Sequence, residues 1–325
     1  MNRSENRYCL DLKLGSINLK SPIILASGTS GHSDELSKYG DLSSLGALTV
    51  KSLTMDPWEG NKPPRISSYG KAVINSVGLQ GPGIKHFILY DYPRLEAANA
   101  NVILSIWAKT VDGYADIAIK IQEAVAAGNL KNVIGIELNI SCPNLEDQNR
   151  LFSQSAEFTA AIASSFKKLC SLPMLVKLSP MVADPVEIAN AAIVSGADVL
   201  TLTNTMFGIG VDAVNLKFEL GNIYGGVSGS SLKPLTQSII KKIRDANRSI
   251  AIVATGGIFT LNDMIEYWFL GANAVGIGTA TLFNPRASFK LQKKLIAHLN
   301  KNGYESFQQY WNYLQEERGK ATDGY

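Results

Sequence analysis

The sequence has little of what marks several large classes of protein. Its 325 residues include three cysteines, at positions 9, 142 and 170, and three histidines. The cysteines are too few for a disulfide framework and form no Cys-x-x-Cys pair, which argues against an iron–sulfur or zinc site made by this chain alone. The histidines lack the spacing of metal ligands. No apolar run reaches the roughly 18 residues expected of a membrane-spanning helix.

Charge of one sign is also scarce. The 31 basic and 28 acidic residues leave a formal net charge of +3, and no basic cluster stands out. We therefore expect no nucleic-acid partner. The first residues, MNRSENRYCLDLKLG, lack the apolar segment of a signal peptide, and unpaired cysteines suit a reducing compartment. These features predict a cytoplasmic protein without a membrane anchor.

Glycine and apolar residues are abundant, and they recur in a pattern. Hydrophobic residues make up 46% of the chain, and there are 28 glycines. Gly46, Gly196 and Gly271 each follow a helical pattern and precede a short apolar run. A glycine that ends a helix just before a buried strand is typical of a βαβ unit. The unit is clearest at 184–204, where Asp184 and Pro185 suit a helix start, and Thr260 to Asp263 form a similar start signal.

Eight short apolar runs predict eight strands. Most are continuously apolar rather than alternating, as expected for parallel strands covered on both faces. Eight such strands with intervening helices favour one closed (β/α)8 TIM barrel, a single domain spanning 1–325, over an open sheet. The predicted strands are 23–27, 47–52, 102–107, 133–140, 174–179, 198–203, 250–254 and 274–278.

Three further segments decorate the predicted barrel. Residues 8–13 and 17–20 flank Gly15-Ser16 and predict a hairpin that plugs the amino-terminal end of the barrel. Long insertions follow the second strand, at about 53–100, and the sixth, at about 206–235. Loops after barrel strands lie on the catalytic face, so we expect both insertions to border the site. In the C-terminal tail, Phe307, Tyr310, Trp311 and Leu314 form a helical stripe that indicates packing.

Polar residues at the predicted strand ends converge on one mouth. They include Lys51, Asn139, Lys177 and the run 203–205 (TNT). They contain neither a Ser-His-Asp triad nor a pair of carboxylates, which argues against serine hydrolases and glycosidases. Buried lysines need a partner because a desolvated ammonium is costly, and a flavin ring would supply one. The alternative is that each lysine extends to the surface.

Small residues at the last two strand ends indicate a phosphate site. Gly256, Gly257, Gly278 and Thr279 stand where backbone N–H groups approach a ligand in many barrels, and Gly229 in the second insertion adds another such position. The alternative is that these glycines only form turns. The phosphate could belong to a substrate or to a cofactor.

Cys142 follows the fourth predicted strand and is bracketed by amides in the segment NISCPN, 139–144. It has no neighbouring histidine, so acyl transfer is poorly supported and proton transfer fits better. The alternative is a buried structural cysteine, which is our interpretation of Cys9 and Cys170.

These residues resemble a known family, the class 1 (soluble, FMN-dependent) dihydroorotate dehydrogenases. The resemblance runs from about residue 8 to about 290. An N-x-x-C-P pattern alone also occurs in the flavin-dependent tRNA dihydrouridine synthases, but its order after NSVGLQGPG is specific. The matching stretches are LASGTSG (25–31), VKSLTMDPWEGNKPPRI (50–66), INSVGLQGPG (74–83), ELNISCPN (137–144), VKLSP (176–180), LTNT (202–205), GGVSG (225–229) with KP (233–234), ATGGI (254–258) and VGIGTA (275–280).

The resemblance implies an FMN-binding barrel that oxidises dihydroorotate to orotate in de novo pyrimidine (UMP) biosynthesis. Cys142 would take the C5 proton while a hydride passes from C6 to the flavin N5. The implied FMN contacts are Ala26, Ser27, Lys51, Asn139, Lys177, Thr203, Gly229, Gly256, Gly257, Gly278 and Thr279. The implied substrate contacts are Lys51, Asn75, Gly78, Leu79, Asn139, Asn144, Asn204 and Thr205.

The resemblance says less about the electron acceptor and the partner subunits. Unlike the membrane-bound class, which has a serine base and an N-terminal membrane helix, this chain has Cys142. The GLQGPG and PWEGNKPPRI stretches look more like the NAD-linked type, which pairs with an iron–sulfur/FAD electron-transfer subunit, than like the homodimeric fumarate type. Trp58 stands where that stretch usually has Arg, Gly81 where Asn is usual, and 145–155 departs from the NAD-linked pattern. We expect a homodimer with or without that subunit.

The sequence leaves two other functions open. The first is another FMN-dependent pyrimidine reductase or dehydrogenase, acting on dihydropyrimidines or on tRNA dihydrouridine. The small net charge of +3 argues against an RNA substrate. The second is a non-redox barrel that binds a phosphorylated metabolite.

Overall fold

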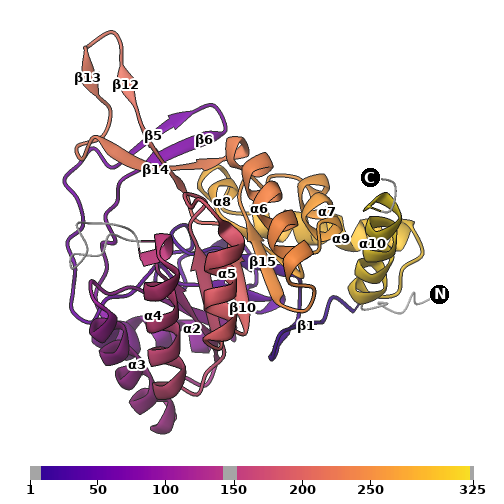
Figure 1. Ribbon diagram of the computed structural model, residues 1–325, viewed down its shortest axis with the longest axis horizontal. Coiled ribbons are helices and arrows are strands. Elements are labelled where there is room, and N and C mark those ends of the chain that lie inside the picture. The colour runs from indigo at the N-terminus through magenta and orange to yellow at the C-terminus, as the bar shows by residue number, and fades with distance from the viewer. Residues whose placement is uncertain (1–8, 142–151, 323–325) are drawn as a thin grey trace.

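The computed structural model describes residues 9–141 and 152–322 (Figure 1). Eight parallel strands close into a barrel in the order β10-β15-β16-β3-β4-β7-β8-β9. This arrangement confirms the predicted (β/α)8 barrel. The barrel strands are β3 (Ile23–Leu25), β4 (Ala47–Thr49), β7 (Val102–Ile106), β8 (Val133–Asn139), β9 (Met174–Leu178), β10 (Val199–Leu202), β15 (Ala251–Thr255) and β16 (Ala274–Ile277).

All eight strands expected from the apolar runs are present, with small differences at their ends. The run 250–254 forms a strand one residue later than predicted, and 47–52 leaves the sheet after Thr49. Strand ends differ because a residue can keep single hydrogen bonds to the neighbouring strand after the regular ladder has ended. Val50 and Leu53, for example, donate to carbonyls of the neighbouring strand β7 beyond the end of β4.

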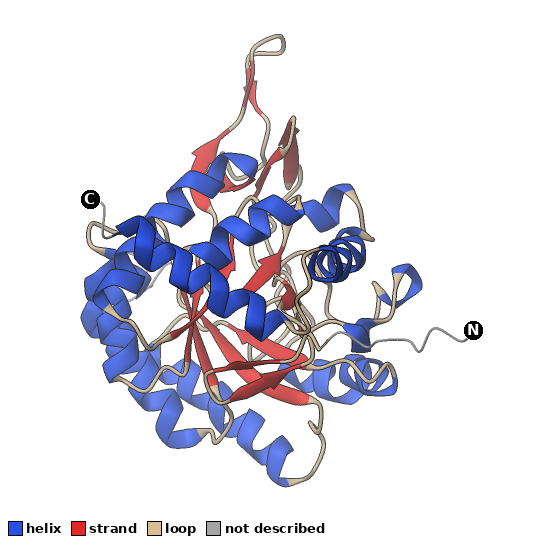
Figure 2. Cartoon of the chain, turned by 90° about the vertical axis from the view of Figure 1, so that its right-hand side faces the viewer, coloured by secondary structure: helices blue, strands red, loops and turns tan. Residues whose placement is uncertain are grey.

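Helices surround the barrel, as Figure 2 shows. The start signals read from the sequence act as predicted. The Asp184 carboxylate accepts a hydrogen bond from the Val186 N–H, and Thr260 and Asp263 form a reciprocal capping box. The helices are α1 (Ile84–His86), α2 (Tyr92–Ala97), α3 (Val111–Ala126), α4 (Ala156–Leu169), α5 (Pro185–Val194), α6 (Lys233–Ala246), α7 (Leu261–Phe269), α8 (Thr279–Phe283), α9 (Ala287–Lys301) and α10 (Phe307–Thr322).

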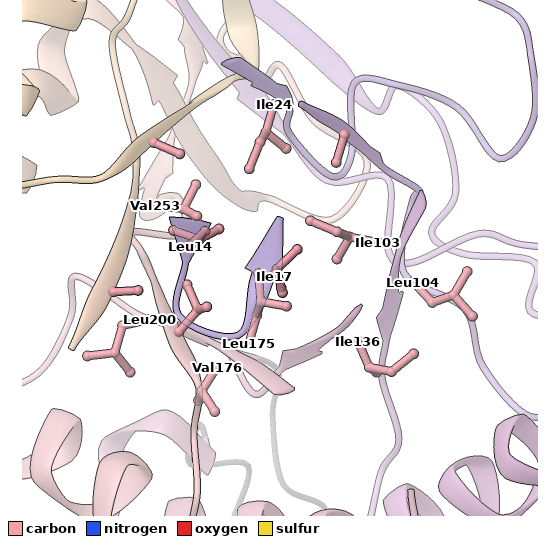
Figure 3. Close-up of a cluster of buried hydrophobic side chains, with 14 of the residues drawn as sticks. Leu14, Ile17, Ile24, Ile103, Leu104, Ile136, Leu175, Val176, Leu200 and Val253 are labelled. Carbon is pink, nitrogen blue, oxygen red and sulfur yellow. The ribbon is translucent and has the colours of Figure 1, made fainter. Parts of the chain in front are cut away.

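A short hairpin closes the amino-terminal end of the barrel, as predicted. Strands β1 (Leu12–Leu14) and β2 (Ile17–Leu19) pair antiparallel around Gly15-Ser16. Gly15 has φ +60°, and a Cβ there would lie 2.7 Å from the Asp198 carbonyl oxygen, so the turn requires glycine. Leu14 and Ile17 are buried, and Figure 3 shows them among side chains of the barrel strands.

The two long insertions meet in one sheet at the other end. Strands β5 (Ile66–Tyr69) and β6 (Ala72–Asn75) come from the first insertion, and β11 (Met206–Ile209) and β14 (Tyr224–Gly229) come from the second. They pair antiparallel in the order β11-β14-β6-β5. The small hairpin of β12 (Val211–Asp212) and β13 (Lys217–Phe218) projects beyond the rest of the molecule (Figure 1).

The C-terminal helix α10 packs on the barrel, as its stripe predicts. Phe307, Tyr310 and Leu314 are buried, and the Trp311 indole N–H donates to the Ala272 carbonyl at 2.7 Å. Among the helices of the described ranges, we find none with both the length and the apolar character that crossing a membrane requires.

Candidate active site

The carboxyl ends of the barrel strands open into a cavity of about 780 Å³. Every predicted site residue in the described ranges lines it, whereas Cys142 and Asn144 lie outside those ranges. The lining residues that the sequence singled out are Ala26, Ser27, Lys51, Asn75, Gly78, Leu79, Asn139, Lys177, Thr203, Asn204, Thr205, Gly229, Gly256, Gly257, Gly278 and Thr279.

The four-stranded sheet forms one wall of this cavity. Phe207, Gly226, Asn75 and Ile66 are register partners in a single row across β11, β14, β6 and β5. All four line the cavity. Because the row draws on both insertions, the wall exists only once segments more than a hundred residues apart have paired.

Amide and hydroxyl side chains at the mouth form a connected chain. The Asn204 amide donates to the Asn139 Oδ1 atom at 3.2 Å, and the Asn139 amide donates to the Ser52 Oγ atom at 2.9 Å. Ser52 is in turn hydrogen-bonded to Ser105 at 2.9 Å. Asn139 is buried, and its backbone carbonyl accepts a hydrogen bond from the Tyr114 hydroxyl. These bonds fix which edge of each amide faces a ligand.

Lysine side chains contribute positive charge to the same cavity. Lys177 lies on β9 opposite Asn139 of β8, and its Nζ atom is 3.8 Å from the buried Glu137 Oε1 atom. Lys51 follows β4, and its backbone N–H donates to the Gly31 carbonyl. The sequence predicted both lysines at the mouth, and the structure places them there.

The glycine-rich end of the cavity cannot accept side chains without rearrangement at most positions. Gly229 has φ +108°, and its added Cβ would lie 2.2 Å from the Lys71 carbonyl oxygen. Gly257 has φ +68°, with Lys233 Cβ at 2.9 Å. Gly278 differs, because a Cβ there meets only Ala26 at 3.7 Å and would otherwise face open space. The backbone therefore stays bare along a cradle of the kind that admits a phosphate.

Another end of the cavity is lined by a loop with left-handed backbone. Gly78 and Leu79 have φ values of +72° and +61°. An added Cβ at Gly78 would lie 2.5 Å from the side chain of Asn61. The Asn75 amide donates to the Gly226 carbonyl at 3.1 Å, and the Thr205 N–H donates to the Asn204 Oδ1 at 2.8 Å. Backbone and amide groups therefore dominate this end.

Two tryptophans and a lysine at this mouth were not predicted as site residues. Trp58 and Gly81, which depart from the family pattern, pair with each other through two backbone hydrogen bonds of 2.9 Å. Trp107 lies edge-on to Trp58, with ring centroids 6.2 Å apart, and the Lys109 ammonium is 3.9 Å from the Trp58 ring centroid. Trp107 follows the third barrel strand, and this position is the sequence signal that identifies it as a candidate site residue.

Glu137 and Ser52 were also missed as candidates, although both stand inside quoted motifs. Glu137 interrupts an apolar strand two residues before Asn139, and that spacing places both side chains on one face. A carboxylate on the inner face of a barrel strand was the available signal.

His32 is partly buried near Lys51, the lysine that follows β4. Its pKa is lowered to about 4, first by burial, then by the positive charge of Lys51, with Glu35 opposing. The neutral imidazole is therefore the stable form near neutral pH. Among the described residues, no group of His, Cys, Asp or Glu side chains could hold a metal ion.

Comparison with known proteins agrees with this geometry. Residues 9–300 match the family model described as dihydroorotate dehydrogenase. Several relatives carry the name dihydroorotate dehydrogenase B (NAD(+)), catalytic subunit. The relative from Alkaliphilus metalliredigens is 37% identical over 279 residues, which cover 86% of this chain and 90% of the relative. That from Listeria welshimeri is 36% identical over 309 residues, with 95% and 98% covered. That from Bacillus pumilus is 37% identical over 300 residues, with 92% and 94% covered. The chain therefore belongs to the dihydroorotate dehydrogenase family of oxidoreductases.

Proposed function

We propose that this protein oxidises dihydroorotate to orotate in pyrimidine biosynthesis, with FMN as its cofactor. The observation that carries the proposal is the convergence of three features on one cavity. These features are a bare glycine cradle, a buried lysine and a fixed chain of amide side chains. Family membership supports the same reaction.

The residues present suit FMN. A cavity of about 780 Å³ lies within the size range of cofactor sites. The backbone of Gly256, Gly257 and Gly278 would hold the phosphate, with Thr279 beside them, and Lys177 would face the ring. Within the described part of the chain, Lys177 donates no hydrogen bond, so its N–H groups remain available to an acceptor in the cavity.

Substrate recognition would use the amide-rich end of the same cavity. Asn75, Asn139 and Asn204 each offer a donor and an acceptor, which matches the imide and amide edges of a pyrimidine. The hydrogen bonds from Asn204 to Asn139 and from Asn75 to the Gly226 carbonyl hold these side chains in one orientation before substrate arrives. The backbone at Gly78 and Leu79 would lie near the substrate carboxylate.

The reaction removes a proton from C5 and a hydride from C6 of dihydroorotate. Cys142 would take the proton, a role supported by the family motif because this residue lies outside the described ranges. FMN, when bound, supplies the acceptor for the hydride. Asn139 and Asn204 would keep the substrate ring oriented, and the walls of the cavity would exclude water.

The electron acceptor and the assembly form the finer part of the proposal. The similar relatives are named as catalytic subunits of an NAD(+) enzyme. We therefore propose that this chain works as a homodimer with an iron–sulfur/FAD subunit that passes electrons to NAD. Because Trp58, Gly81 and 145–155 depart from the pattern of the NAD-linked type, the possible electron acceptors should be compared directly.

One anaerobic experiment tests the central claim. The purified protein is expected to be yellow and to bleach when dihydroorotate is added without air. A yellow protein whose flavin stays oxidised with dihydroorotate would contradict the proposal. A colourless protein that binds no FMN would favour a non-redox barrel. A flavin that is reduced by a nicotinamide cofactor and reoxidised by uracil or tRNA would favour the other pyrimidine reductases.

Reoxidation of the reduced protein then tests the acceptor. Fumarate, NAD and a quinone are added separately, and return of the flavin absorbance is followed. Direct reoxidation by fumarate would contradict the NAD-linked assignment. Reoxidation by NAD only after the electron-transfer subunit is supplied would support it.

A further inference from the structure

Two buried side chains of opposite charge lie in the barrel beneath the cavity. Glu137 is two residues before Asn139 on β8, so both side chains face the barrel interior. Lys177 on β9 is the register partner of Asn139. The side chains of Glu137 and Lys177 are 4% and 9% exposed, and their Oε1 and Nζ atoms are 3.8 Å apart.

This contact depends on charge rather than on hydrogen bonding. A separation of 3.8 Å is too long for a hydrogen bond. Among the described residues, the Glu137 Oε1 atom has no hydrogen-bond partner, and neither has the Thr201 Oγ1 atom, which belongs to the register partner of Lys177 on β10. A buried pair with such poor hydrogen bonding contributes little to stability, because the desolvation cost offsets its attraction.

We propose that Glu137 is a positioning and charge-balancing residue for Lys177, and that it thereby sets the reduction potential of bound FMN. The inference rests on the proposed function, because it requires FMN in this cavity. Only Lys177 of the pair lines the cavity. Glu137 does not line the cavity, so it acts through Lys177: it holds the Lys177 ammonium in place and cancels part of the positive potential that the ammonium exerts in the cavity.

The direction of the effect follows from electrostatics. A cation beside the ring stabilises the reduced flavin, which is the more negative form. Loss of the Glu137 charge leaves the Lys177 charge uncompensated, which raises the reduction potential. Loss of the Lys177 charge leaves the carboxylate alone, which lowers it. If the two side chains served only in packing, there would be no reason for their substitutions to shift the reduction potential in opposite directions.

The test is a measurement of the flavin midpoint potential in the holoprotein. The flavin is reduced anaerobically with a chemical reductant against a reference dye, without dihydroorotate. Glu137→Gln is expected to shift the reduction equilibrium about tenfold toward reduced flavin, which is about 30 mV for a two-electron couple. Lys177→Met is expected to shift it at least as far in the opposite direction. Glu137→Asp keeps the charge and should stay close to the wild type.

A matched control comes from an exposed pair of the same type. Glu123 and Lys120 lie on α3 with their charged atoms 2.9 Å apart, and Glu123→Gln should leave the potential unchanged. An unchanged potential in Glu137→Gln, or equal shifts in Glu137→Gln and Glu137→Asp, would overturn the proposal.

A second comparison covers the case in which Glu137→Gln does not fold. The double variant Glu137→Gln/Lys177→Met removes both charges, and its potential should return toward the wild type from that of Lys177→Met. A double variant no closer to wild type than Lys177→Met would overturn the proposal. Because dihydroorotate is absent throughout, failure of the proposed reaction would be seen separately, as a flavin that dihydroorotate does not bleach.

Discussion

At the amino ends of the barrel strands, Leu14 and Ile17 of the plug hairpin are buried among aliphatic side chains (Figure 3). At the carboxyl ends, Asn139 and Lys177 occupy comparably buried positions around an open cavity. The same eight strands therefore run from a filled, apolar end to a polar end that leaves space for a ligand.

The difference shows how the barrel separates stability from chemistry. Apolar side chains at the plug gain free energy from burial, on the order of 25 cal/mol per Å² of apolar surface. Polar side chains at the mouth lose hydration, and a poorly bonded pair such as Glu137 and Lys177 recovers only part of that cost. We therefore expect changes at the plug to affect unfolding, and changes at the mouth to affect ligand binding and reaction.

The largest expected effect is at the plug. Leu14→Ala removes a side chain that is 0% exposed and leaves a cavity in a packed core. The free energy of unfolding is expected to fall by about 2–5 kcal/mol. Chemical denaturation measures this loss. At a temperature where the variant stays folded, its FMN dissociation constant and its rate of flavin reduction should match those of the wild type. A slower reduction in a fully folded, fully loaded variant would contradict the separation of the two ends.

The next effect is at the mouth and concerns the reaction alone. Cys142→Ser replaces the proposed base with a hydroxyl, which is far less acidic than a thiol and a poorer match for proton transfer. Flavin reduction by dihydroorotate is expected to slow on the order of 10²-fold or more. Stopped-flow absorbance gives the rate, and denaturation should show little change in unfolding. Cys170→Ser is the comparison at a buried cysteine far from the barrel mouth. An unchanged reduction rate in Cys142→Ser would contradict the role of this residue.

A smaller effect is expected at the glycine cradle. Because a Cβ at Gly278 meets only Ala26, at 3.7 Å, Gly278→Ala places a methyl group in ligand space without a steric clash with the protein. We expect the FMN dissociation constant to rise about tenfold, equivalent to about 1.4 kcal/mol. The unfolding free energy of the FMN-free protein should change by less than about 0.5 kcal/mol.

Gly257→Ala is the contrasting variant at the same cradle. Its φ of +68° and the nearby Lys233 Cβ predict a loss of both stability and FMN affinity. Equal FMN affinity in Gly278→Ala and the wild type would show that this end of the cavity does not hold the phosphate.

How far the sequence predicts this molecule depends on the range of the interactions involved. Continuous apolar runs identify all eight barrel strands, because burial on both faces is a local property of each run. Helix starts at Asp184 and Thr260 are likewise local. The sheet that walls the cavity was not predicted. Its four strands, 66–69, 72–75, 206–209 and 224–229, are short and partly polar, and they are defined by pairing with each other rather than by their own pattern.

The candidate site shows the same division. The residues at strand ends, such as Lys51 and Asn204, could be predicted because the topology of a barrel brings all strand ends to one mouth. Trp58 and Lys109 could not, because their relation to Trp107 depends on how loops fold over the mouth. Glu137 stands out in the sequence as a carboxylate inside an apolar strand, but its partner Lys177 cannot be identified until the register with β9 is known.

The smallest expected effect links the charged mouth to stability through His32. Its pKa in the folded protein is about 4, against an ordinary value of 6.5, because burial and Lys51 disfavour the charged imidazole. Between these values the unfolded chain binds a proton that the folded protein does not. Stability is therefore full above about pH 6.5 and falls as the pH decreases toward 4.

Urea denaturation across this pH range measures the effect. His32→Gln removes the titrating group, so its unfolding free energy should fall less steeply with acidification than that of the wild type. One proton contributes at most about 1.4 kcal/mol per pH unit, and partial exposure of His32 to solvent should bring the difference well below that limit. Lys51→Met should reduce the slope in part, because it removes the second cause of the lowered pKa. Identical slopes in the wild type and His32→Gln would show that folding does not lower the pKa of His32.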